Sequence, residues 1–200
     1  MSARRIPIVP TVVVVAAAAV MVALGVWQLG RADEKAELIA RYEAAGQQGP
    51  VSLGDDDLDG FLYRTVSYPC PDPTEWTAVA GRNSAGRTGY AQQFVCRERI
   101  DWAQDDVEVT PAIIAAVGWS PGPNRPEWSG GRAEGVLSRA GEDYRIVMAQ
   151  PVAGLDQLAR PDPGDLPNNH LAYAGQWFFF ALTALLVYSF ALRKKWREQG

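Results

Sequence analysis

Residues 6–29 read IPIVPTVVVVAAAAVMVALGVWQL, an uncharged run in which Thr11 and Gln28 are the only polar side chains. As a helix rising about 1.5 Å per residue, the run covers roughly 36 Å, enough to cross a hydrocarbon core of about 30 Å. A second uncharged run, LAYAGQWFFFALTALLVYSFAL, occupies residues 171–192 and leads directly into the basic block RKKWR at 193–197. The two runs predict two transmembrane helices.

A cleaved signal peptide is the alternative interpretation of the first run. Arg4 and Arg5 form a plausible positive region ahead of it, and the alanines at 16–19 resemble a cleavage zone. The apolar part of a signal peptide is about 7–15 residues long, however, and this run is longer. The sequence therefore favours a retained span.

The distribution of charge orients the two spans. Arg4 and Arg5 precede the first run and the basic block follows the second, whereas the middle of this chain of net charge −4 is acidic. The positive-inside rule then places both termini in the cytoplasm and the middle on the opposite side. Trp27 and Trp177 fall near the same outer interface, which indole rings favour. With so few residues before the first run we expect no mitochondrial transit peptide, and hence a bacterial inner membrane with a periplasmic domain.

These patterns predict a membrane protein, a two-helix transmembrane hairpin that carries a mainly antiparallel β (α+β) extracytoplasmic domain. The expected segments are a cytoplasmic N-terminus (1–5), transmembrane helix 1 (6–29), the β-rich domain (30–169), transmembrane helix 2 (170–192) and a cytoplasmic basic tail (193–200).

Within the outer domain, residues 32–45 (ADEKAELIARYEAA) are rich in helix formers and predict a helix that ends near Gly46. Beyond it, short β-branched and aromatic runs are separated by Gly and Pro, which favours strands. These runs are 62–68, 76–80, 90–97, 107–119, 134–138 and 144–148. Pro111 predicts a break or an edge position in the fourth run. Residues 120–131 predict a surface loop, and 152–160 a short helix.

Composition and motifs exclude several classes of function. The acidic middle disfavours nucleic acid, which requires a basic footprint. HExxH, GxxxxGK[ST], GxGxxG and CxxC motifs are all absent from the sequence. Ser84, Ser120 and Ser138 have no histidine near them in sequence, so a Ser/His hydrolase is poorly supported and we expect no enzyme.

Neither the cysteines nor the acidic run at 55–59 (DDDLD) predicts a metal site. Cys70 and Cys96 are the only cysteines, and both fall in the predicted oxidising compartment. A disulfide requires Cα atoms about 4.4–6.8 Å apart, which a sequence does not reveal, so the bond stays undecided. The acidic run lacks the ligand register and closing Glu of a calcium loop, and predicts a solvated turn.

His170 is the strongest candidate for a binding residue. It is the only histidine and heads the second span, directly after Asn168 and Asn169, either of which can cap a helix. Tyr173 and Trp177 follow it on one helical face. A helix N-terminus disfavours imidazolium and favours the neutral ring that binds metals. The alternative is an interfacial histidine that bonds to lipid headgroups or to the first helix.

The segment Trp27-Gln28-Leu29-Gly30-Arg31 ends the first span at the same depth. Arg31 can pair with an anionic group such as a porphyrin propionate or a phosphate, and Gln28 can bond across to Gln176. The alternative is an interface anchor whose charge extends to the headgroups. Small residues at 16–19, with Ala23 and Gly25, allow the helices to approach closely.

Two motifs at the ends of the chain carry a family resemblance. GVWQLGR at 25–31, followed by Lys35 and LIAR at 38–41, resembles the GxWQxxR…K…LIxR signature of the surfeit-locus protein one family. NHLAYAGQWF at 169–178 resembles the NHxxYAxxWF signature with which that family enters its second helix.

Weaker matches lie between them at 86–90 (GRTGY), 117–121 (VGWSP) and 134–137 (EGVL). The chain departs from the family pattern at Val117, where Arg is usual, and at Glu34, where an aromatic residue often precedes the lysine.

The resemblance implies a Shy-one-like assembly factor for cytochrome c oxidase and related haem–copper oxidases, which binds haem a transiently and aids its insertion. It implies that His170 is the axial ligand of the haem iron and that Arg31 lies near a propionate. The implied haem-binding residues are His170, Trp27, Gln28, Arg31, Tyr173 and Trp177. An imidazole at the interface suits haem a, whose farnesyl tail belongs in lipid and whose propionates belong at the surface.

The implied partners are the oxidase catalytic subunit, the haem a synthesis machinery and the lipid bilayer, and a homo-oligomer is compatible with the sequence. The alternative function is a membrane scaffold that stabilises an oxidase assembly intermediate without binding haem. An enzyme on the outer face is the weakest hypothesis, because no acid/base or nucleophile constellation is visible.

Overall fold

The computed structural model describes residues 6–54, 58–98 and 110–198. The chain divides into two compact units. We call Met1–Leu38 with Pro167–Gly200 the helical unit, and Ile39–Leu166 the β unit.

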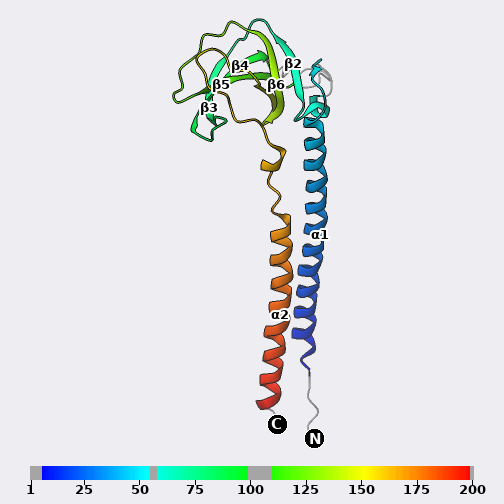
Figure 1. Ribbon diagram of the computed structural model, residues 1–200. Coiled ribbons are helices and arrows are strands. Elements are labelled where there is room, and N and C mark those ends of the chain that lie inside the picture. Colours follow the sequence, from blue (N-terminus) through cyan, green and yellow to red (C-terminus); the bar gives the residue numbers. More distant parts are fainter. Residues whose placement is uncertain (1–5, 55–57, 99–109, 199–200) are drawn as a thin grey trace, which may run out of the picture. The chain divides into compact units, whose positions relative to one another are not determined.

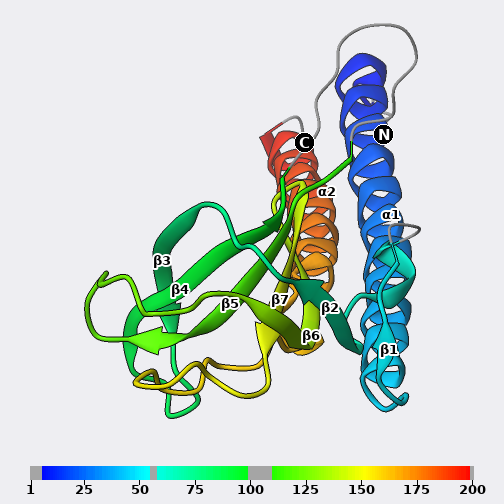
Figure 2. The same ribbon diagram turned by 90° about the horizontal axis from the view of Figure 1, so that it is seen from above.

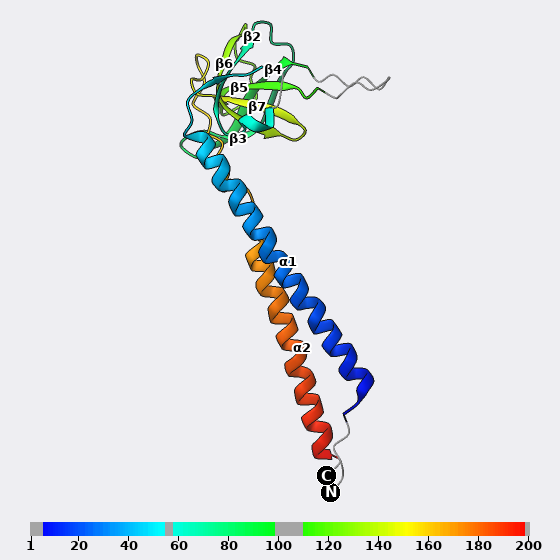
Figure 3. The same ribbon diagram turned by 90° about the vertical axis from the view of Figure 1, so that its right-hand side faces the viewer.

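The helical unit is an antiparallel pair of long helices. α1 (Ile8–Gly46) and α2 (His170–Glu198) run side by side, so that the start of α1 and the end of α2 lie at the same end (Figures 1 and 3). The helix expected over residues 32–45 is confirmed as the continuation of α1, and it ends at Gly46 as predicted. Both helices are long and apolar enough to cross a membrane.

Small residues spaced seven apart form the contact between these helices. Ala18, Gly25 and Ala32 are the buried residues of α1, and Ala174 and Ala181 are those of α2. A seven-residue spacing keeps one side of each helix facing its partner. The fit is closest at Gly25, because a Cβ atom there would lie 2.6 Å from the nearest ring carbon of Phe178.

The remaining surface of the helical unit is apolar. Val13 is 61% exposed, Phe179 64% and Phe190 63%, and other large apolar side chains on both helices are similarly open. In a water-soluble protein such a surface is covered by other parts of the chain. The helical unit is therefore compatible with a two-span membrane protein.

The β unit contains one seven-stranded sheet among the described residues, in the order β1-β2-β6-β7-β5-β4-β3. Its strands are β1 (Val51–Ser52), β2 (Thr65–Cys70), β3 (Trp76–Arg82), β4 (Thr88–Arg97), β5 (Ile113–Ser120), β6 (Gly131–Ala140) and β7 (Asp143–Met148). Two short 3-10 helices, η1 (Leu58–Phe61) and η2 (Pro163–Asp165), complete the unit. Figure 2 shows β3, β4, β5 and β7 following one another across the sheet.

The pairing of strands is mixed. β1 pairs with β2 in parallel, and β5 pairs with β7 in parallel, whereas the other neighbours are antiparallel. The expected mainly antiparallel α+β domain is thus confirmed, with two parallel exceptions that the sequence did not predict.

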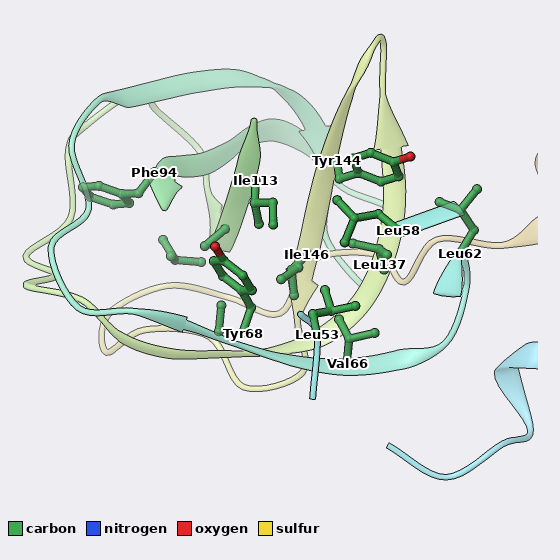
Figure 4. Packing of buried hydrophobic residues seen from close by; sticks show 13 residues of the cluster. Leu53, Leu58, Leu62, Val66, Tyr68, Phe94, Ile113, Leu137, Tyr144 and Ile146 are labelled. Carbon is green, nitrogen blue, oxygen red and sulfur yellow. The ribbon is translucent and has the colours of Figure 1, made fainter. Parts of the chain in front are cut away.

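The main core lies on the inner face of the sheet. Phe94, Ile113, Leu137 and Ile146 are among the largest fully buried side chains, and Figure 4 shows them in one cluster with Tyr68. Along β7, Ile146 enters this core, and the alternation of a strand turns its neighbours to the opposite face. That opposite face carries a smaller cluster of Ala91, Ala116, Trp119, Val147 and Leu158.

A disulfide settles the question left open by the two cysteines. Cys70 at the end of β2 is bonded to Cys96 in β4, with Cα atoms 4.9 Å apart. Strands β6, β7 and β5 lie between β2 and β4 in the sheet order. Two strands so far apart in a sheet meet only if the sheet curls, so the bond closes the sheet around its core.

The short helix expected at 152–160 is wrong. Gly154 adopts φ 85°, and Trp119 and Asp156 form an isolated antiparallel bridge. The amide of Val152 donates to the carbonyl of Val117, and Asn83 bridges Leu158. These backbone groups bond to neighbouring strands, which leaves none for a helix.

The expected strand at 62–68 begins late, at Thr65. The amides of Leu62 and Arg64 donate to carbonyls of η1, and Tyr63 takes φ 63°, so this stretch is a turn. Pro111 does break the run at 107–119, of which 107–109 lie outside the described residues, and β5 begins two residues later at Ile113. β5 is a central strand and not an edge strand, since it lies between β7 and β4. Pro111 is compatible with this position because it precedes the paired residues of β5.

Of the solvated turn expected at 55–59, residues 55–57 lie outside the described residues, and Asp59 lies in the short η1 with its side chain 55% exposed. The Asp59 carboxylate accepts hydrogen bonds from Nη2 of Arg139 at 2.5 and 2.6 Å and from the Tyr144 hydroxyl at 2.9 Å. Asp59 therefore ties η1 to β6 and β7. The loop expected after Ser120 is confirmed, since no helix or strand intervenes before β6.

Candidate functional site

His170 is the first residue of α2 and is half-buried. Its Nδ1 lies 2.7 Å from Oε1 of Gln28 on α1. Because an amide oxygen only accepts hydrogen bonds, this pairing requires a hydrogen on Nδ1. In the neutral ring Nε2 then carries a lone pair, which is the state in which histidine binds metals.

The positions of Gln28 and His170 follow from the spacing of the helix contact. Gln28 comes three residues after the buried Gly25, and His170 four residues before the buried Ala174, so each continues its contact stripe. One turn further along α1, the carbonyl of Ala32 accepts a hydrogen bond of 3.2 Å from the amide of Asn168. Two polar contacts therefore hold the beginning of α2 against α1.

The start of α2 agrees with one of the two predicted capping positions. Asn169 directly precedes α2, and its carbonyl accepts the first bond of the helix from the amide of Tyr173, 3.2 Å away. Asn168 instead donates its side-chain amide to the carbonyl of Ala32 on α1.

The partner predicted for Gln28 is wrong, because Gln28 bonds to His170 and not to Gln176. Gln176 is exposed on α2. The prediction paired Gln28 with Gln176 because both side chains are amides. The seven-residue spacing of the small residues indicates instead which face of each helix meets the other, and Gln28 and His170 lie on those faces.

The other predicted site residues form no bond with this pair among the described residues. Arg31 forms an ion pair with Glu34 on its own helix. Trp27 is 57% exposed and Tyr173 49%, and Trp177 packs edge-on against Phe180 at 6.3 Å between ring centroids. Among the described residues, the structure gives no ring contact between Trp27, Tyr173 and Trp177.

Helix geometry nevertheless places these residues at ordered heights. Arg31 lies about 4.5 Å along the axis of α1 from Gln28, toward the C-terminal end of that helix. Because α2 runs in the opposite direction, Tyr173 and Trp177 lie on the other side of His170, about 4.5 and 10.5 Å along its axis. Along the axis of the helix pair, the backbone positions of Arg31 and of Tyr173 and Trp177 thus lie on opposite sides of the Gln28–His170 pair.

The hydroxyls considered for hydrolysis have other roles in the β unit. Ser138 donates to the carbonyl of Arg145, and Ser120 to that of Gly122. Over residues 6–54, 58–98 and 110–198, no three His, Cys, Asp or Glu side chains are grouped to hold a metal ion.

Two long apolar helices, a small mixed sheet and a histidine at the head of the second helix are compatible with a two-span membrane protein that carries one folded domain. The SURF1 family model matches residues 15–182, which include nearly all of this architecture. The chain belongs to the SURF1 family. This is a family of oxidase assembly factors and not of catalysts. No curated protein matches the chain.

Proposed function

We propose that this protein assists the assembly of a haem–copper terminal oxidase by binding haem a at His170 and passing it to the catalytic subunit. The observation that supports this function is the bond between Nδ1 of His170 and Gln28. It fixes the ring orientation and leaves Nε2 as the coordinating atom, as in protein metal sites where a carbonyl accepts the other ring hydrogen.

The residues around His170 fit the chemistry of haem a. His170 would hold haem a through Nε2, and the bound group would supply an iron atom that accepts a nitrogen ligand. Arg31 pairs with a propionate by exchanging its exposed Glu34 partner, which costs little because exposed ion pairs are weak. Tyr173 and Trp27 offer exposed rings against which a flat macrocycle packs.

The proposed location is a bacterial inner membrane, with both termini in the cytoplasm and the β unit in the periplasm. Basic residues precede the first apolar run and follow the second, and the positive-inside rule places such residues in the cytoplasm. The Cys70–Cys96 disulfide supports an oxidising compartment for the β unit. A green fluorescent protein fused after Gly200 should fluoresce, because that reporter folds in the cytoplasm, and a dark fusion of normal abundance would overturn the orientation.

The optical spectrum tests haem binding directly. The protein is purified from cells that make haem a, as the wild type, His170→Ala and the control Ser189→Ala, whose hydroxyl bonds only within α2. We expect haem absorbance in the wild type and the control and its loss in His170→Ala. A wild type without haem, or His170→Ala with an unchanged spectrum, would refute the proposal.

Oxidase activity in the same cells separates this function from that of a scaffold. The proposal expects His170→Ala to lower the yield of haem-loaded oxidase. Normal oxidase in His170→Ala cells, together with its loss when the β unit is deleted, would favour a scaffold that does not bind haem.

A further inference from the structure

A pocket of about 390 Å³ lies on the outer face of the sheet in the β unit. Its floor is formed by small residues, among them Gly81, Ala91 and Ala116, and Leu158 and Leu166 border it. The main core fills the opposite face. The pocket is therefore separate from the core, and all of its lining residues belong to the β unit.

Four arginines line this pocket, which we call the arginine pocket: Arg82, Arg139, Arg145 and Arg160. Arg139 is neutralised by its ion pair with Asp59. The structure gives the other three no ion pair with any described residue. Arginines that form no ion pair attract an anion strongly.

Arg145 lies on a central strand, and its guanidinium is partly buried. It lies in β7 opposite Ser138 of β6 and Ile114 of β5, and points away from the core that Ile146 enters. Its Nε is buried and has no hydrogen-bond partner among the described residues. Burial lowers the pKa of Arg145 from its ordinary value, yet a guanidinium stays protonated at neutral pH. A partly buried charge with an orphaned donor is costly unless an anion compensates it.

Two carboxylates also lie on the rim. Asp162 accepts a hydrogen bond of 2.8 Å from the amide of Gly164, which holds it in the cap of η2. Asp165 is the other, and neither forms an ion pair with a described arginine of the pocket. Three unpaired arginines against two carboxylates leave a net positive lining, and the carboxylates limit which anions enter.

We propose that the arginine pocket binds a phosphate group, held by Arg145 and Arg160 with Arg82 at its edge. Guanidinium groups form forked hydrogen bonds to phosphate oxygens, and a tetrahedral phosphate has enough oxygens for several such groups at once. The apolar floor beside the arginines suits the glycerol and first methylenes of a phospholipid. The phosphate belongs either to an anionic lipid headgroup or to free inorganic phosphate.

Calorimetry on the full chain in a neutral detergent distinguishes these sources. The probes are short-chain phosphatidylglycerol below its micellar concentration, the same lipid with a choline headgroup, and inorganic phosphate. We expect saturable binding of the phosphatidylglycerol that weakens as ionic strength rises. If inorganic phosphate binds saturably and displaces the lipid, the site binds free phosphate, and the proposal of a phosphate site still holds. If neither phosphatidylglycerol nor inorganic phosphate binds saturably, the proposal is overturned.

Matched variants locate the binding. Arg145→Met and Arg160→Met should each weaken it at least about tenfold, because each removes a charge-assisted pair. Arg132→Met removes an equal charge outside the pocket, where Arg132 donates to Ser67, and should change affinity less than about twofold. Asp165→Asn should tighten binding by removing a rim charge. If Arg145→Met fails to fold, the exposed Arg160 carries the test, and equal losses in Arg160→Met and Arg132→Met would refute the site.

Discussion

The Oε1 atom of Gln28 and the Nδ1 atom of His170, 2.7 Å apart, join the two helices where α2 begins. Neither residue has another side-chain bond of this kind among the described residues, so each sets the orientation of the other. The amide oxygen fixes which nitrogen of the ring carries hydrogen, and the ring supplies that oxygen with a donor. The predictions below begin with this pair.

Replacing Gln28 should weaken haem retention without abolishing it. Gln28→Leu removes the acceptor that orients His170, and loss of such a partner lowers metal affinity by about tenfold to a hundredfold. The haem content per polypeptide, read from the optical spectrum, measures the effect. Gln176→Leu removes an exposed amide from α2 and should retain wild-type haem content, and equal losses in both variants would contradict the assignment.

A side chain at Gly25 should separate the helices. Gly25→Ala places a Cβ 2.6 Å from Phe178 and should destabilise the helical unit by about 1–3 kcal/mol, the usual cost of overpacking. Thermal unfolding in detergent measures it. Gly30→Ala is the control, because nothing lies within 4 Å of a Cβ there. Adding Phe178→Ala to Gly25→Ala should restore much of the lost stability. If it does not, the contact between residues 25 and 178 is not the source of the destabilisation.

Removing the disulfide should destabilise the β unit strongly. The bond closes a loop with a sequence separation of 26, and loops of about this size contribute roughly 3 kcal/mol through the unfolded state. Denaturant unfolding of Cys70→Ser/Cys96→Ser against the wild type measures this difference. Reductant should destabilise the wild type similarly and leave the double variant unchanged. A variant as stable as the oxidised wild type would refute the closing role of the bond.

Tyr63 should make stability fall in alkali. Burial, followed by the charges of Tyr42, Asp165 and Asp162, raises the pKa of Tyr63 above its ordinary value of 10.0. The folded state therefore keeps its proton longer than the unfolded chain, and this contribution is complete below pH 10 and lost as pH rises through the folded pKa. The free energy of unfolding above pH 10 should decline more steeply in the wild type than in Tyr63→Phe. Parallel declines would exclude Tyr63 as the source.

Local patterns predicted much of this fold. The uncharged runs revealed α1 and α2, and the runs between Gly and Pro revealed six of the seven strands in position, because side-chain type and spacing act locally. The parallel pairing of β5 with β7 was hidden, since it depends on contacts between distant segments. Residues 152–160 were misassigned because their backbone partners, such as Val117, lie far away in sequence.

The candidate site was predicted in part. His170 stood out because it is a lone histidine at the head of an apolar run. Its partner Gln28 was matched to the wrong residue, since which faces of two helices meet is decided by packing along their whole length. Arg145 was not predicted at all, because nothing in its sequence neighbours reveals that its strand is central and that it forms no ion pair with a described residue.

The link between β2 and β4 also determines how this chain matures. Its sequence contains two cysteines, so oxidation within one molecule has a single product, and no scrambled isomer exists to be corrected. Maturation thus needs a thiol oxidant but no disulfide isomerase. The yield of folded chain would depend on the supply of thiol oxidant. It would not depend on the disulfide isomerases that cysteine-rich secreted proteins require.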